Sequence, residues 1–212
     1  MMLVTCGAMS SSDVTSSEVP SPDATLSETQ VAILDAVQSV IVRSGVEGAS
    51  MRQVAEEADV SLGLLSYHFD DKDSLILAAF ERATTALLEA SVTAAARAED
   101  ADTKVAAFLS GSFDDRFLDS EYLQLRISLW AVAVSNDDLA KVDGRYYDHY
   151  RSSLVKLVAD ARPDLDSDDI TARVTDVIAL TNGLWLDWAR FGNVEHLERG
   201  LALGEAITLG GR

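Results

Sequence analysis

The sequence predicts an all-α protein, and three observations lead to this prediction. Ala and Leu are abundant, only three prolines occur among the 212 residues, and 48% of the chain is hydrophobic. Apolar residues recur at intervals of three and four, which is the period of an amphipathic helix. The alternation typical of a half-buried strand is absent. This length and composition suffice for a small domain joined to a larger helical one.

The N-terminal region combines a polar tail with a first helix. Residues 1–25 are rich in Ser, Thr, Asp and Pro and show no apolar period, so we expect a disordered tail. The first helix is expected from Leu26 to Ser44. Ser27 or Thr25 can cap its beginning, and Gly45 can end it.

Two short helices are expected in the stretch Ser50–Lys72. Ser50 can cap the first helix, and Gln53 three residues later can complete a capping box. Asp59 lies in the turn, and Ser61 can cap the second helix. Two helices joined by so short a turn form a helix-turn-helix, whose second helix is built to lie in the major groove of DNA.

A long helix follows, and its apolar face can pack against two parts of the protein and link them. Five further helices complete the chain. The nine expected helices cover residues 26–44, 50–58, 62–69, 71–99, 103–113, 120–134, 137–161, 168–191 and 194–209. We therefore predict a DNA-binding domain at residues 26–72 and a second helical domain at residues 73–212.

Charge and cysteine content bear on partners and compartment. The formal net charge is −18, which is unusual for a DNA-binding protein because such a protein normally presents a basic face. Arg52, Lys72, the helix N-termini and the pair Tyr67–His68 would supply nearly all the phosphate-binding capacity of the helix-turn-helix. The single cysteine, Cys6, cannot form a disulfide within the chain. Neither a signal peptide nor a long apolar run is evident, so a cytoplasmic protein is expected.

The stretch AEEADVSLGLLSYHFDDKDSLI resembles the N-terminal domain of TetR-family transcriptional regulators. The family pattern is Ala-Gly-Val-Ser-x-Gly-x-x-Tyr-x-x-Phe, followed by an acidic residue, Lys, another acidic residue and Leu. The residues that carry the resemblance, which covers roughly residues 26–80, are Ala58, Val60, Ser61, Gly63, Phe69, Lys72, Asp73 and Leu75. A nine-helix TetR-like fold is what the resemblance implies.

Two positions depart from the common pattern. Asp59 replaces the turn glycine, and Asp tolerates a left-handed conformation better than most residues. Ser66 stands where most members have Tyr, with Tyr67 one position later, which is similar to the BetI-like branch that regulates choline and glycine-betaine metabolism. The later stretches ISLWAVAVSNDDLAKVDGRYYDHYRSSL and ALTNGLWLDWA are also similar to that branch.

The resemblance implies a set of DNA contacts. Gly63 would permit close approach of the backbone, Leu62 would touch a thymine methyl, and Tyr67 and His68 would reach phosphates or base edges. The alternative is that Tyr67 and His68 lie on a solvated helix face. The full set of expected DNA-binding residues is Ser50, Arg52, Ser61, Leu62, Gly63, Tyr67, His68 and Lys72.

The resemblance further implies a ligand-responsive repressor that binds a palindromic operator as a homodimer through its last two long helices. The apolar stripe from Val174 to Trp188 would form this interface, or alternatively the core of one subunit. A small-molecule inducer would bind in the second domain. Its expected contacts are Trp130, Tyr146, Tyr147, Tyr150, Asn182 and Trp185. Nearby acidic residues favour a cationic amine such as choline or betaine, held by cation–π contacts, although ordinary aromatic core packing is the alternative.

Rival functions are an enzyme and an interaction protein. The three histidines His68, His149 and His196 lack the spacing of a zinc or di-iron site, and no phosphate-binding loop or nucleophile elbow is present. We therefore expect no catalytic residue, metal or cofactor. Because the helix-turn-helix is acidic, the alternative of an interaction protein that keeps the fold but does not bind DNA stays open. The choice between repressor and activator also stays open.

Overall fold

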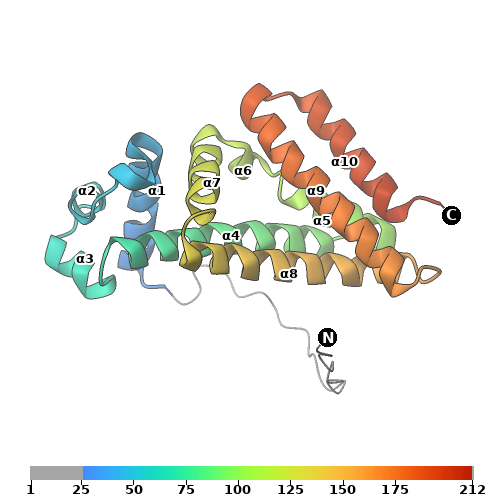
Figure 1. The fold of residues 1–212 in the computed structure, drawn as a ribbon, viewed down its shortest axis with the longest axis horizontal. Helices are drawn as coiled ribbons and strands as arrows, with labels where there is room; N and C mark the ends of the chain where they lie inside the picture. The colour runs from blue at the N-terminus through green and yellow to red at the C-terminus, as the bar shows by residue number, and fades with distance from the viewer. Residues whose placement is uncertain (1–25, 212) are drawn as a thin grey trace, which may run out of the picture.

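The structure, a computed structural model, describes residues 26–211, and every regular element in that part of the chain is an α-helix (Figure 1). The helices are α1 (Glu28–Gly48), α2 (Met51–Glu57), α3 (Leu62–His68), α4 (Lys72–Ala96), α5 (Ala101–Gly111), α6 (Asp115–Leu118), α7 (Ser120–Ala133), α8 (Asp137–Ala161), α9 (Ser167–Phe191) and α10 (Val194–Leu209). The predicted all-α fold is confirmed, and all nine expected helices are present. The tail predicted at residues 1–25 lies outside the described residues.

The additional element, α6, is a single turn of four residues. Asp114 caps it by accepting a hydrogen bond from the backbone N–H of Arg116 at 3.3 Å, and Phe117 is buried. The indole N–H of Trp188 in α9 donates to the carbonyl oxygen of Leu118 at 3.0 Å and ties this turn to the body. Four residues are too few to show a helical period, so the sequence pattern did not predict α6.

Helices α4 and α8 run side by side along the length of the molecule (Figure 1). Helices α1, α2 and α3 gather at the N-terminal end of α4, and α5, α9 and α10 gather toward its other end. Helix α7 stands between the two groups and contacts both α1 and α8. None of the helices in the described part of the chain has the length and apolar character needed to cross a membrane.

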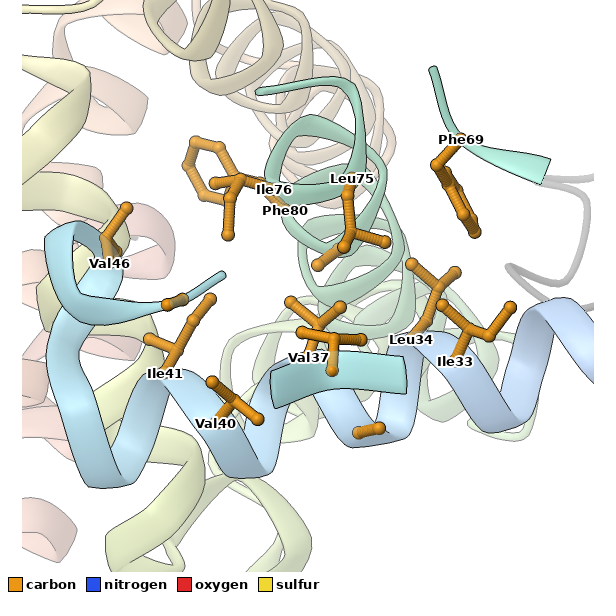
Figure 2. Packing of buried hydrophobic residues seen from close by; sticks show 14 of the residues in the cluster. Ile33, Leu34, Val37, Val40, Ile41, Val46, Phe69, Leu75, Ile76 and Phe80 are labelled. Carbon is orange, nitrogen blue, oxygen red and sulfur yellow. The ribbon is translucent and has the colours of Figure 1, made fainter. Parts of the chain in front are cut away.

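The hydrophobic core of the first three helices continues into the body. Ile33 and Val37 of α1 lie in one buried cluster with Phe69 and with Phe80 of α4 (Figure 2). Leu129 of α7 belongs to the same cluster. Each such side chain contributes about 1.5–3 kcal/mol by leaving water. The N-terminal helices are therefore packed directly against α4 and α7 rather than joined to them by a loose hinge.

The ends of the first two helices show where local expectations held and where they did not. Gly45 has the non-helical angles φ 70° and ψ 168°, but one more helical turn follows it, so α1 reaches Gly48 instead of stopping at Ser44. Ser50 caps α2 as expected, accepting from the backbone N–H of Gln53 at 3.3 Å. The Gln53 side chain accepts from the Ser50 hydroxyl at 2.7 Å, so the reciprocal half of the expected capping box is missing.

Candidate functional site

A tight turn sets the second helix of the helix-turn-helix at an angle to the first. Asp59 has φ 52° and is the one non-glycine residue with a positive φ among residues 26–211. The N–H of Val60 donates to the carbonyl oxygen of Ala55 at 3.0 Å, and the Ser61 hydroxyl accepts from the N–H of Leu64 at 3.0 Å. The side chain of Leu65 is fully buried and holds α3 against the bundle. Asp thus replaces the turn glycine in the left-handed conformation that the sequence suggested.

The outer side of α3 carries exposed apolar side chains. Tyr67 is 82% exposed, Leu62 48% and Leu64 40%. The rings of Tyr67 and His68 meet edge to face, with centroids 5.2 Å apart. A Cβ added at Gly63 would have only the Ser61 hydroxyl, at 3.9 Å, within reach. Internal packing therefore does not explain the glycine or the exposed apolar side chains, and such a surface is typical of an interaction site.

Sequence reasoning missed Leu64. It was grouped with neither the core nor the exposed face, although its side chain is 40% exposed and it lies one helical turn before Tyr67. Residues three apart lie on the same side of a helix, so the expected exposure of Tyr67 was the available signal for Leu64.

The basic residues of the helix-turn-helix are all engaged within the chain. Arg43 forms a two-point ion pair with Glu57 at 2.6 and 3.2 Å, and this contact lowers the pKa of Glu57 below its ordinary value. Arg52 pairs with Glu56 at 3.1 Å. The ammonium group of Lys72 donates to the carbonyl oxygen of Glu47 at 2.9 Å. The expected phosphate roles of Arg52 and Lys72 therefore require these cations to exchange an internal partner for DNA.

Replacing Glu56 with Gln should strengthen DNA binding, because it removes a negative charge and frees Arg52 for phosphate. We expect about 3- to 10-fold tighter binding to all duplexes at low salt, with a smaller gain as salt screens the charges. The measurement is a fluorescence-anisotropy titration at several salt concentrations. Glu99→Gln, which makes the same charge change beyond the C-terminal end of α4, is the control and should leave affinity nearly unchanged. Equal gains from both variants would show that only net charge matters.

The six expected ligand contacts are brought together by α7, α8 and α9 around two adjoining cavities. The inner cavity has a volume of about 30 Å³ and is lined by Tyr150, Trp185 and Ser112, among others. The outer cleft has a volume of about 590 Å³ and includes Trp130. Both are lined by Tyr146, Tyr147, Asn182 and Arg126. The six residues predicted from the sequence therefore all line these two adjoining cavities, which we call the ligand pocket. Their role in binding stays a prediction.

Arg126 is the residue of this pocket that sequence reasoning missed. Its side chain is only 5% exposed, and its guanidinium carbon lies 4.4 Å from the ring centroid of Trp130 and 5.0 Å from that of Trp185. A signal was present, because Arg126 is a charge within the apolar run Leu125–Trp130 and lies one helical turn before Trp130.

Two buried tyrosines of the pocket, Tyr146 and Tyr150, are neutral hydroxyls. Burial raises the pKa of Tyr146 to about 12 and raises the pKa of Tyr150 further, with the positive charge of Arg126 opposing both shifts in part. The hydroxyl of Tyr150 is buried without a hydrogen-bond partner. The pocket therefore offers one fixed positive charge and an unused hydroxyl in a largely aromatic wall.

A larger groove, of about 640 Å³, lies between α1, α4 and the α6–α7 region. Two of its arginines are paired within the chain, since Arg82 pairs with Asp35 at 2.6 Å and Arg116 with Asp114 at 3.4 Å. Clusters of His, Cys, Asp or Glu suited to a metal ion are not found within residues 26–211. The pocket around Arg126 is thus the better candidate for a ligand that supplies missing interactions.

The stripe from Val174 to Trp188 faces the core of the subunit. Val174 and Val177 are fully buried, and Leu184 and Trp185 are nearly so. Helix α9 turns a different face to solvent, which carries small, apolar, polar and charged side chains: Ala172, Thr175, Asp176, Ala179, Asn182, Gly183, Leu186, Ala189 and Arg190. Of the two alternatives, the stripe is the intrachain core, and a second subunit could only meet the opposite face.

Comparison with known proteins agrees with this arrangement. The profile for bacterial regulatory proteins of the tetR family matches residues 33–79, and the profile for the C-terminal domain of BetI-type transcriptional repressors matches residues 101–208. The transcriptional regulator BetI of Pseudomonas paraeruginosa is 30% identical over 164 residues, which cover 76% of this chain and 80% of that protein.

Solved structures show the same fold. A transcriptional regulator from Pseudomonas aeruginosa PAO1 superposes with a TM-score of 0.77 at 26% identity, over 85% of this chain and 88% of the other. A regulator from Saccharomonospora viridis in complex with choline gives a TM-score of 0.67 at 19% identity, over 82% and 94% of the two chains. These relatives are regulators and not enzymes, as expected for this sequence. The chain belongs to the TetR family of bacterial transcriptional regulators and has a BetI-type C-terminal domain.

Proposed function

We propose that the protein is a ligand-responsive repressor that binds a palindromic operator as a homodimer in the cytoplasm and is released by a small-molecule inducer. The observation that supports this most is the outer side of α3, where Leu62, Leu64 and Tyr67 are exposed around a glycine that no internal contact requires. A helix with such a face, supported from behind by Leu65, is suited to enter a major groove.

The proposed DNA contacts divide into two kinds. The α3 residues Ser61, Leu62, Gly63, Leu64, Tyr67 and His68 would meet base edges and the nearest phosphates. Ser50 and Arg52 at the start of α2, with Lys72 at the start of α4, would hold phosphates and so fix the register without reading sequence. Leu64 is added to the residues expected from the sequence.

The proposed dimer uses α9 and α10. Gly183 lies in the middle of α9, and no atom lies within 4 Å of the position that its Cβ would take. Glycine inside a helix costs about 1 kcal/mol relative to alanine, so the subunit alone gives no reason for it. Close approach of a second helix would supply one. Leu186 on α9 and Leu203 on α10 are also exposed and would be covered by the same contact.

Helix α7 is the proposed link between ligand and DNA. Leu125 and Leu129 lie in the core shared with α1 and α3, whereas Arg126 on the same helix lies in the ligand pocket. The hydroxyl of Tyr122 donates to the carbonyl oxygen of Ala83 at 3.2 Å and ties α7 to α4. A ligand that binds more tightly to one position of α7 would therefore repack the core beneath the helix-turn-helix. In the dimer this would change the distance between the two copies of α3.

The proposed function is tested by titrating the purified protein against a labelled duplex from upstream of its own gene. We expect saturable binding that is tighter than binding to a random duplex. Analytical ultracentrifugation should show two subunits bound to each operator. The logarithm of the association constant should fall linearly with the logarithm of salt concentration. Equal affinity for specific and random duplexes at every salt concentration would reject the repressor and favour an interaction protein, a role that the acidic surroundings of α3 would suit.

A further inference from the structure

The pocket between α7, α8 and α9 holds a buried cation that lacks a counter-charge. Arg126 forms no ion pair with any carboxylate of residues 26–211, and its Nε atom is buried without a hydrogen-bond partner. Burial of a charged group is costly unless the group is paired and hydrogen-bonded. The ligand-free pocket is therefore electrostatically incomplete, and its missing component is negative.

The aromatic faces that could hold a cationic ligand are already in use. The guanidinium carbon of Arg126 lies 4.4 Å from the ring centroid of Trp130, 5.0 Å from that of Trp185 and 5.7 Å from that of Tyr146. All three distances are within the range of about 6 Å over which a cation is attracted to a ring face. A second cation at these faces would be repelled by Arg126. This argues against the cationic amine expected from the sequence.

We propose that the inducer is an organic carboxylate whose oxygens bind the guanidinium of Arg126, an inference that rests on the proposed regulatory function and names the ligand of that pocket. The planar fork of arginine matches a carboxylate in a two-point contact. Tyr150 supplies a free hydroxyl beside it in the inner cavity, which has room for a group the size of one or two water molecules.

The remaining walls define the rest of the ligand. The outer cleft is lined by apolar groups, among them Trp130, Val134 and Leu186, and its volume of about 590 Å³ suits an apolar body attached to the carboxylate. Asp143 and Asp148 line the same cleft. Because one cation and two carboxylates line the cleft, a ligand with a single negative charge is favoured over a doubly charged phosphate ester.

The experiment uses pairs of ligands that differ in charge but hardly in shape. Benzoate, phenylacetate and hexanoate are titrated beside benzamide, phenylacetamide and hexanamide, with choline as the cationic probe. Binding is followed by isothermal titration calorimetry and by the fluorescence of Trp130 and Trp185. We expect at least one carboxylate to bind about 10- to 100-fold more tightly than its amide. Choline should bind more weakly than that carboxylate.

Two variants separate a ligand-binding role of Arg126 from a structural one. Arg126→Gln should abolish the preference for carboxylate over amide, and Arg126→Lys should retain part of it. Because the replaced cation is buried and unpaired, Arg126→Gln should fold with an unchanged or higher Tm. A lower Tm with the ligand preference intact would show that Arg126 only supports the aromatic side chains, and would overturn the proposal.

The outcomes for the ligand and for the regulatory function can be told apart. If no carboxylate in the series binds more tightly than its amide while the unliganded protein binds its operator, the carboxylate proposal fails and the repressor proposal stands. If carboxylates bind through Arg126 but operator binding is absent, the carboxylate proposal stands and the repressor proposal fails. If both hold, the bound carboxylate should lower operator affinity in the same anisotropy assay.

Discussion

Replacing Gly63 with alanine should lower operator affinity about 100-fold or more while leaving the fold as stable as before or more so. The added methyl group would meet only the Ser61 hydroxyl, at 3.9 Å, so nothing in the subunit resists it. Alanine is also the better helix former, by about 0.5–1 kcal/mol. At the DNA surface the same methyl group would hold the backbone of α3 away from the groove.

The loss counts twice because a dimer uses two copies of α3. If each half-site loses about 1.4 kcal/mol, the two together lower the association constant about 100-fold. Anisotropy titrations against the operator measure this loss, and thermal denaturation measures the stability of the same preparation. An operator affinity that is unchanged in Gly63→Ala would show that α3 does not approach DNA through this residue.

Gly144→Ala is the matched control for this experiment. Gly144 lies inside α8, and no atom lies within 4 Å of the position that its Cβ would take. The chemical change and the gain in helix propensity are therefore the same, but the residue belongs to α8, which lies apart from α3 (Figure 1). We expect Gly144→Ala to raise the Tm by about 2–4 °C and to leave operator affinity unchanged.

Local rules predicted most of the fold, because helix boundaries depend on residues that lie close together in the chain. Asn136, a residue type favoured at helix N-termini, caps α8 by accepting hydrogen bonds from the N–H groups of Asp138 and Leu139, at 3.1 and 3.0 Å. Asp59 took the left-handed conformation that its side chain tolerates. Gly192 ends α9 with φ 54°, as glycine commonly does.

Properties that depend on distant residues were harder to predict. The stripe Val174–Trp188 was consistent with either core or interface, because periodicity shows which face is apolar but not what covers it. Arg126 was missed for a related reason. Its meaning depends on Trp130 of α7 and Trp185 of α9 lying around it, and on the lack of an ion pair with any carboxylate of residues 26–211. Neither condition can be read from neighbours in the sequence.

The acidic character of the helix-turn-helix also acquires a physical meaning. Glu57 holds Arg43, Glu56 holds Arg52, and the carbonyl oxygen of Glu47 holds Lys72. Each proposed phosphate contact would therefore replace an internal one, which would weaken binding to DNA of any sequence. The proposed base contacts of Leu62, Leu64 and Tyr67 are not opposed in this way. A low non-specific affinity with retained base contacts raises the ratio of specific to non-specific binding.

Replacing Gly111 with alanine should have the opposite effect to Gly63→Ala, with a large loss of stability and little change in DNA affinity. Gly111 is the last residue of α5, where α5 crosses α4. Its added Cβ would lie 2.8 Å from the Cα of Ser91, 2.9 Å from the carbonyl oxygen of Ala90 and 2.9 Å from the Cβ of Ala94. Two of these three atoms belong to the backbone of α4, so no rotation of a side chain can make room.

The two helices must then move apart, and overpacking of this kind costs about 1–3 kcal/mol. For a chain of 212 residues we expect the Tm to fall by about 4–10 °C, whereas the same change at Gly144 should raise it. Because Gly111 packs on the part of α4 remote from α3, operator affinity measured well below the Tm should stay within about twofold of the parent protein, as expected for independent, distant sites. A normal Tm for Gly111→Ala would mean that α4 and α5 do not cross as closely as their backbones indicate. A large loss of operator affinity without unfolding would instead show that the crossing of α4 and α5 sets the positions of the two copies of α3. In that case α4, together with α7, would transmit the ligand signal to the DNA-binding helices.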